Sequence, residues 1–97
     1  MSHFLLTNAA KRDLIGIAIF TQQRWGIDQR DKYLAQLDYM FHQLAGNPGL
    51  GRNCDYIKHG YRKFPIASHV IYYRTFSDQI EIIRVLHKRM DVSESIF

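Results

Sequence analysis

The chain has 97 residues, of which 46% are hydrophobic and 13% aromatic, and its formal net charge is +4. This composition indicates one folded domain over residues 1–97 and excludes a disordered segment. No stretch approaches the ~20 apolar residues of a membrane span, and residues 1–20 lack the features of a signal peptide. The single cysteine, Cys54, has no partner for an internal disulfide, so we expect an inert thiol and a cytoplasmic location.

The N-terminal quarter is predicted to form a short strand followed by a helix. Ser2–Thr7 is apolar enough for the strand, and Thr7 can cap the helix through its hydroxyl. Apolar residues recur along this helix in steps of three and four, and Ile15 and Ile19 widen the stripe. The stripe consists of Ala10, Leu14, Ile17, Ala18, Thr21 and Trp25. We expect Trp25 to belong to the core, and Gly26 to end the helix.

A second helix is predicted to begin at Asp28, which has a side chain suited to an N-cap. Its apolar stripe consists of Tyr33, Leu37, Met40, Phe41 and Leu44. The sequence Gly46-Asn47-Pro48-Gly49 then stops the helix. Because so few residues separate the two helices, they should form an antiparallel hairpin. Neither helix can bury its stripe on the other alone, so the hairpin needs a further layer.

The second half of the chain supplies that layer as a predicted three-stranded antiparallel meander. The strands are Tyr61–Phe64, His69–Arg74 and Gln79–His87, each rich in β-branched and aromatic residues and separated by turn signals. With the N-terminal segment as a fourth strand, the class is α+β, a two-layer arrangement with the helices on one face of the sheet. The other face and an edge of the sheet should remain available to a partner.

Positive charge is concentrated in the same half of the chain. Residues 58–89 hold seven Lys and Arg residues against two Asp and Glu residues. A basic surface of this kind favours an acidic partner, either a nucleic acid or an acidic protein. The sequence alone leaves both open.

Chemical motifs give little support to an enzyme. The glycines of GNPGLG precede no Lys-Ser/Thr pair, and the five histidines have no ligand spacing, so we expect turn residues, no metal and no cofactor. Metal-free RNA cleavage would need a base, an acid and cations. Suitable residue types are His59, His69, His87, Arg62, Arg74, Arg84 and Tyr61. Strand alternation separates Arg74 from His69, which favours a structural role but leaves a ribonuclease as the alternative.

A family resemblance extends over nearly the whole chain. The segments LTNAAKRDL, TQQRWG, LAGNPGLGR, GYRKFPIASHVIYYR and IEIIRVLHKRMD resemble, in order, the ParE toxins of bacterial toxin–antitoxin systems. The paired FP…HVIYYR and IRVLHKRMD segments are the most specific part. Asn8 stands where the family often has proline, which affects the start of the helix only.

The resemblance implies a RelE/ParE-like fold and a non-catalytic toxin that inhibits DNA gyrase. It also implies neutralisation by a ParD-like antitoxin, whose ribbon–helix–helix part binds operator DNA, so that the toxin meets this DNA only indirectly. The alternatives are a ribosome-dependent mRNA interferase of the RelE kind, whose terminal tyrosine is lacking here, and a degenerate toxin that only binds partners.

Two sets of residues follow as candidates for binding. The candidates for docking the antitoxin or the target are the basic residues Arg62, Lys63, Arg74, Arg84, His87, Lys88 and Arg89. The candidates for an apolar groove on the helical hairpin are Trp25, Tyr33, Leu37, Met40 and Phe41.

Overall fold

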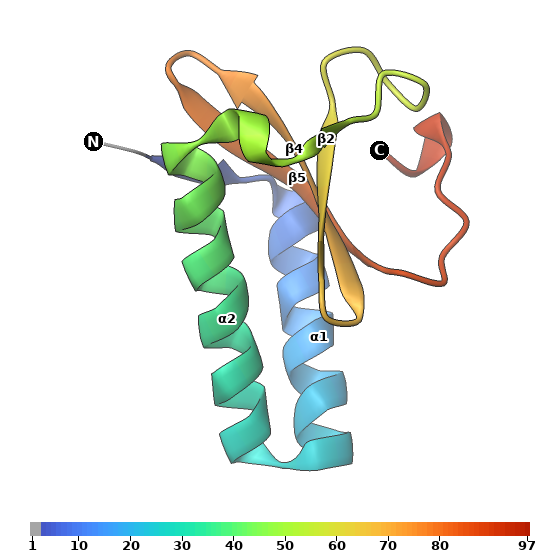
Figure 1. Ribbon diagram of the computed structural model, residues 1–97. Helices are drawn as coiled ribbons and strands as arrows, with labels where there is room; N and C mark the ends of the chain where they lie inside the picture. The colour runs from blue at the N-terminus through green and yellow to red at the C-terminus, as the bar shows by residue number, and fades with distance from the viewer. Residues whose placement is uncertain (1–2) are drawn as a thin grey trace.

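The structure, a computed structural model, describes residues 3–97 and has a helical hairpin packed on one face of a mixed five-stranded sheet (Figure 1). The strands are β1 (Phe4–Leu6), β2 (Arg52–Asn53), β3 (Arg62–Ile66), β4 (His69–Phe76) and β5 (Gln79–His87), in the order β1-β5-β4-β3-β2. The helices are α1 (Asn8–Trp25) and α2 (Ile27–Gly46), with two 3-10 turns, η1 (Pro48–Leu50) and η2 (Glu94–Ile96). The predicted α+β class, with a hairpin between an N-terminal strand and a meander, is confirmed.

Thr7 joins the first strand, the first helix and strand β5 of the sheet. Its hydroxyl oxygen accepts a hydrogen bond from the Ala10 amide at 3.0 Å, as predicted for a helix cap. The same hydroxyl donates to the carbonyl oxygen of Ile83 at 2.7 Å, and the Thr7 amide donates to that of Ile82 at 3.1 Å. One residue therefore fixes where α1 starts and where it lies on β5. Ser2, included in the strand prediction, is outside the described residues.

Gly26 is the whole connection between the two helices. Its φ of 92° lies in the region that L-residues with a side chain rarely adopt, so glycine suits the reversal. The predicted end of α1 is confirmed. The prediction of Asp28 as N-cap is wrong, because α2 already begins at Ile27 and Asp28 lies in its first turn. There its carboxylate still favours the helix through the positive end of the helix dipole.

The meander consists of β3, β4 and β5, which are joined by two tight turns. Of the three predicted strands, only β5 has the predicted bounds. The β4–β5 turn has φ of 49° at Ser77 and 65° at Asp78, as hairpin turns with two left-handed residues require. Strand β3 starts one residue later than predicted and, like β4, ends two residues later. Strand β1 pairs in parallel with β5, so the chain enters the sheet beside its last strand.

Strand β2, which the sequence did not reveal, is held in place by Tyr73. The Tyr73 hydroxyl donates to the carbonyl oxygen of Pro48 at 2.7 Å and accepts from the Gly51 amide at 2.8 Å. A β-carbon at Gly51 would collide with this hydroxyl and with the carbonyl oxygen of Lys63. Gly51 is therefore needed for close approach of two chain segments, and not for the turn that the sequence suggested.

The main core lies between the helices and the sheet. Fully buried side chains from both layers meet there, among them Leu37, Leu44, Ile71, Ile80 and Ile82. The α2 stripe is thus confirmed as core, with Met40 partly buried against it. The prediction of Trp25 as a core residue is wrong, since 64% of its surface is exposed, and Ile15 and Ile19 are exposed as well. Ile15 and Ile19 alternate along α1 with the buried Ile17 and Thr21 and therefore lie on a side of the helix away from the core.

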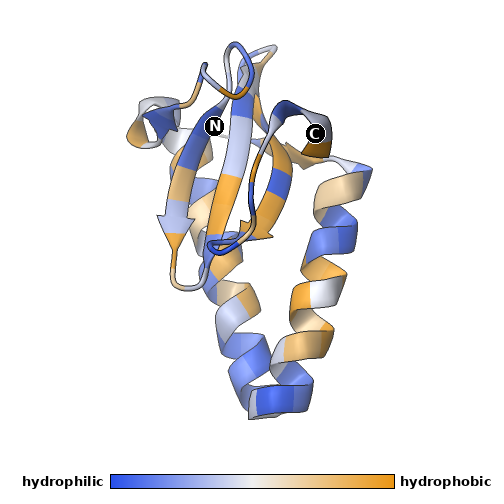
Figure 2. Cartoon of the chain, turned by 90° about the vertical axis from the view of Figure 1, so that its right-hand side faces the viewer, coloured by the Kyte–Doolittle hydropathy of each residue, from blue (hydrophilic) through white to orange (hydrophobic). Residues whose placement is uncertain are grey.

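The opposite face of the sheet is not open, which corrects the expectation that this face remains available to a partner. A second buried cluster contains Cys54, Tyr61, Tyr72, Ile83 and Leu86. The C-terminal segment crosses this face, and its end is apolar (Figure 2). The Phe97 ring packs edge-on against Tyr61 and Tyr72 at centroid distances of 5.3 and 5.2 Å. Burial raises the pKa of the Cys54 thiol, which disfavours the reactive thiolate.

Neither helix of the described part of the chain combines the length and the apolar character that a membrane crossing requires.

Candidate functional site

A cavity of about 600 Å³ opens beside the helical hairpin, between α1, α2, the β3–β4 turn and the end of β5. We call it the hairpin groove. Its lining from α1 and α2 consists of Arg12, Asp13, Gly16, Ile17, Phe20, Thr21, Trp25, Gln29, Tyr33 and Gln36. Its lining from the turn, β5 and the residues after β5 consists of Ala67, Ser68, His69, Arg84, Val85, Leu86, His87 and Met90.

One wall of the hairpin groove exposes large apolar side chains. Phe20 and Trp25 on α1 are 59% and 64% exposed, and Met90 beyond β5 is 45% exposed. The Arg24 guanidinium lies 5.5 Å from the centre of the Trp25 ring, which keeps a cation at this end of the groove. Grouped exposed apolar side chains with a polar rim are typical of binding surfaces for other proteins.

The opposite wall contains two histidines from neighbouring strands. His69 on β4 pairs directly with His87 on β5, and their ring centres are 5.4 Å apart. The Nδ1 atom of His69 lies 2.6 Å from the hydroxyl of Tyr33 on α2. Burial is the main cause that lowers the pKa of His69, and the charge of His87 lowers it further. His69 is therefore neutral at pH 7 and serves as a hydrogen-bonding group on the groove wall.

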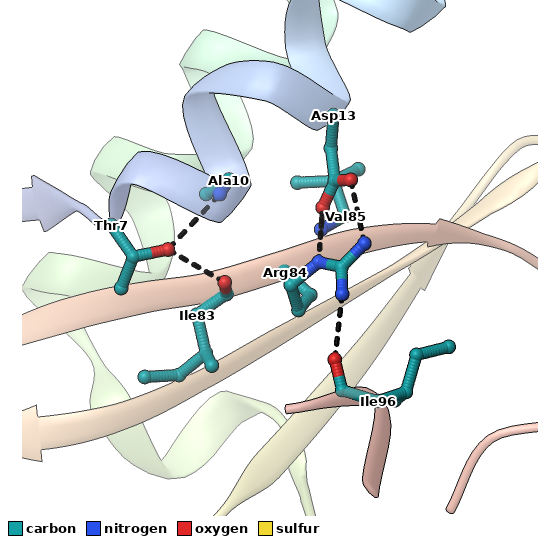
Figure 3. A network of polar contacts seen from close by, with 7 residues as sticks. All are labelled: Thr7, Ala10, Asp13, Ile83, Arg84, Val85 and Ile96. Carbon is teal, nitrogen blue, oxygen red and sulfur yellow. Dashed lines mark hydrogen bonds and ion pairs between the residues drawn. The ribbon is translucent and has the colours of Figure 1, made fainter.

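An ion pair closes the base of the groove at the part of β5 that lies beyond its pairing with β1 (Figure 3). Arg84 donates from Nε and Nη2 to the Asp13 carboxylate at 2.7 and 2.9 Å, and the Val85 amide donates to the same carboxylate at 3.0 Å. The remaining Nη1 donates to the carbonyl oxygen of Ile96 at 2.7 Å. The hydrogen bonds to Asp13 raise the pKa of Arg84. This guanidinium thus connects α1, β5 and the C-terminal segment.

Three of the seven residues suited to RNA cleavage, His69, His87 and Arg84, line the hairpin groove, whereas the other four lie elsewhere. Arg84 is held there in its ion pair with Asp13. His69 and His87 are adjacent, but Arg74 is paired with Glu81 at 2.9 Å and Arg62 donates to the carbonyl oxygen of Gly51. The side chain of His59 is 98% exposed in the loop before β3. Within residues 3–97, no three side chains of the metal-ligating kinds come together either.

The predicted hairpin-groove residues divide between two cavities. Trp25 and Tyr33 line the hairpin groove, whereas Leu37 and Phe41 line a second apolar cavity of about 370 Å³ between α1, α2 and β1. Met40 lines neither. A helical period places Trp25 on the stripe of α1 and the other four on the stripe of α2, but it does not say where the hairpin surface divides into two hollows.

The predicted docking cations are likewise dispersed. Arg84 and His87 line the hairpin groove, and Lys88 and Arg89 follow directly after β5. Lys63 lies on β3, near the other edge of the sheet.

Sequence reasoning missed Phe20, Gln29 and Met90 as groove residues. Phe20 follows Ile17 by three residues, so the helical period could have placed it beside the stripe. No pattern in the sequence brings Met90 to α1.

Comparisons with known proteins identify the class. The family described as "ParE toxin of type II toxin-antitoxin system, parDE" matches residues 4–92. "Toxin ParE1" of Mycobacterium tuberculosis is 44% identical over 96 residues, with 98% of each chain covered. "Toxin ParE1" of Caulobacter vibrioides is 37% identical over 91 residues, with 94% of each covered. The chain therefore belongs to the ParE toxin family of type II toxin–antitoxin systems.

A solved structure shares the fold. A chain from the "Chromosomal ParDE TA system from P. aeruginosa" superposes with a TM-score of 0.77 at 21% identity, covering 90% of this chain and 96% of that one.

Proposed function

We propose that this toxin inhibits DNA gyrase, and so replication, by binding and not by catalysis. The hairpin groove carries the proposal, because it is a preformed docking surface in which the arginine beside the two histidines is engaged by Asp13. The family likeness supports gyrase as the target. A toxin without chemistry of its own acts by binding one conformation of its target more tightly than the others. The toxin acts as one domain in the cytoplasm, where gyrase works, without metal or cofactor.

A ParD-like antitoxin would neutralise the toxin by placing an amphipathic C-terminal helix in the hairpin groove. Apolar anchors at i, i+3 and i+7 of such a helix suit a groove walled by Phe20, Trp25 and Met90. Lys88 and Arg89 near the rim favour an acidic segment. The ribbon–helix–helix part of the antitoxin would bind operator DNA.

The target is tested by two assays on the purified toxin. We expect inhibition of supercoiling by gyrase and no cleavage of messenger RNA on ribosomes. The variants His69→Gln and His87→Gln should retain gyrase inhibition, whereas loss of a catalytic base would lower a cleavage rate ~10²–10⁴-fold. Cleavage that depends on these histidines would establish the RelE-type activity instead. Absence of both activities would indicate a toxin that only binds partners.

The antitoxin site is tested by association rates at several salt concentrations. Lys88→Glu/Arg89→Glu should slow association with the antitoxin and reduce its salt dependence, because two steering charges at the groove are reversed. Lys11→Glu/Lys32→Glu makes the same change of net charge on exposed positions of α1 and α2 outside the groove lining. Equal rates for the two variants would contradict the proposed electrostatic contact.

A further inference from the structure

Uncompensated positive charge lies at the edge of the sheet opposite β1, where β2 pairs with β3. Arg52 and Lys63 are directly opposite each other in this antiparallel pair. Like charges in such cross-strand positions repel each other and destabilise the sheet. In residues 3–97, neither side chain has a carboxylate within ion-pair distance. An anionic partner would remove this repulsion.

An exposed aromatic ring lies beside these cations. Tyr56, in the loop between β2 and β3, is 74% exposed. The Lys63 ammonium donates to its hydroxyl at 2.7 Å and lies 5.4 Å from its ring centre. This hydrogen bond is the main cause that raises the pKa of Lys63, so its charge is secure at pH 7. Lys58 in the same loop contributes a third cation, and its ammonium lies 5.7 Å from the ring centre of Tyr61 just before β3.

The carboxylate in this loop, that of Asp55, is engaged in hydrogen bonds to neighbouring residues. Asp55 accepts hydrogen bonds from the Gly60 amide at 2.7 Å and from Nδ2 of Asn53 at 3.0 Å. These bonds, chiefly that from Gly60, lower the pKa of the Asp55 carboxyl. The carboxylate therefore shapes the loop that presents Tyr56.

A shallow hollow of about 370 Å³ adjoins the two strand cations. Arg52 and Lys63 line it together with the apolar side chains of Leu50, Phe64, Pro65 and Val70. An acidic peptide could use the cations, but its carboxylate side chains offer no flat group that stacks on the ring of Tyr56. A nucleotide supplies a phosphate for the cations and a flat base for the apolar surface.

We propose that Arg52, Lys58, Lys63 and Tyr56, with the adjoining hollow, form a binding surface for single-stranded DNA. The cations contact successive phosphates, and an unpaired base stacks on Tyr56 or enters the hollow. The choice of DNA over RNA rests on the proposed action on gyrase, a DNA enzyme. The hollow and the hairpin groove share no lining residue, so antitoxin and DNA need not compete.

The test is fluorescence anisotropy with a labelled single strand of about 12 nucleotides, a typical site size. Three phosphate contacts predict a slope of about −2 for the logarithm of affinity against the logarithm of salt concentration. Arg52→Gln/Lys63→Gln should reduce the slope to about a third of this value. Lys11→Gln/Lys32→Gln, with the same loss of charge on the helices, should leave affinity and slope unchanged. Circular dichroism checks that each variant is folded.

The stacking part is tested separately. Tyr56→Leu should weaken binding of the single strand by roughly five- to one-hundred-fold, as expected for the loss of one stacked base. Binding to a duplex of the same sequence should be weaker than to the single strand and unaffected by this variant, because paired bases cannot reach the ring.

Three results would overturn the proposal. These are equal losses of DNA affinity in the two double variants, binding of poly-L-glutamate as tight as that of the DNA strand, and tighter binding of an RNA strand of the same sequence. Gyrase inhibition is measured on the same preparations. Inhibition of gyrase by a toxin that does not bind DNA would contradict the proposed DNA-binding surface and leave the proposed function intact. DNA binding without inhibition would support the surface and contradict the proposed function.

Discussion

The ion pair between Asp13 and Arg84 should be a large single contribution to stability, and Arg84→Met is the variant that tests it. The substitution keeps most of the apolar stem. It removes two hydrogen bonds to Asp13 and one to the Ile96 carbonyl oxygen. It also leaves the Asp13 carboxylate, whose side chain is 14% exposed, with only the Val85 amide as a hydrogen-bond donor.

The expected cost follows from the burial of the pair. Hydrogen bonds to charged groups contribute about 1.5–3 kcal/mol, and removing one partner of a fully buried pair costs about 3–5 kcal/mol. The two side chains are 19% and 14% exposed, so we expect a loss of about 2–3 kcal/mol for Arg84→Met. For a chain of this length that corresponds to a melting temperature lower by roughly 10–20 °C. Asp13→Asn keeps an acceptor for the Val85 amide and should cost about 1–2 kcal/mol.

A double-mutant cycle with urea denaturation separates coupling from simple loss of contacts. The Asp13→Asn/Arg84→Met protein contains no unpaired charge. It should therefore lose at least ~1 kcal/mol less than the sum of the single variants. Additivity within ~0.5 kcal/mol would refute the view that the two charges depend on each other.

Three further predictions concern the core, the groove and pH. Leu37→Ala should cost ~2–5 kcal/mol, because Leu37 is fully buried, and an unchanged melting temperature would contradict its place in the core. Trp25→Ala should leave the melting temperature nearly unchanged and weaken antitoxin binding by about 2 kcal/mol or more, measured by calorimetry. Unaltered affinity would exclude Trp25 from the interface. The lowered pKa of His69 means that the unfolded state binds its proton first, so stability falls as pH drops below about 6.5. His69→Gln keeps an acceptor for Tyr33. Its free energy of unfolding, measured by urea denaturation, should fall less between pH 7 and pH 5 than that of the parent protein. An equal fall in both proteins would assign the pH dependence to other groups.

Local signals predicted the elements of this fold because the physics that forms them is local. Thr7 and Gly26 act through their own side chain and backbone, so their roles are visible in the sequence. The parallel pairing of β1 with β5 and the short strand β2 depend on contacts between distant segments. No periodicity within one segment encodes such contacts.

The candidate site was harder to predict for the same reason. Composition locates basic residues in the second half of the chain, but it does not distinguish a free cation from an engaged one. Arg84 is bound to Asp13, which lies 71 residues earlier, whereas Lys63 faces another cation. Trp25 satisfies the helical period of α1, yet the sheet ends before it and leaves the ring exposed.

The parallel pairing of β1 with β5 has a consequence for how the toxin is made. Phe4–Leu6 leaves the ribosome before the helical hairpin, whereas its partner residues, 80–82, leave after it. The helical hairpin can form early from local contacts, while the strand that covers its apolar face arrives last. Folding of the sheet is therefore postponed until β5 has been synthesised, and a product truncated before residue 80 cannot complete the sheet. A cell that interrupts translation of this message would release an unfolded fragment, open to proteolysis, and no active toxin.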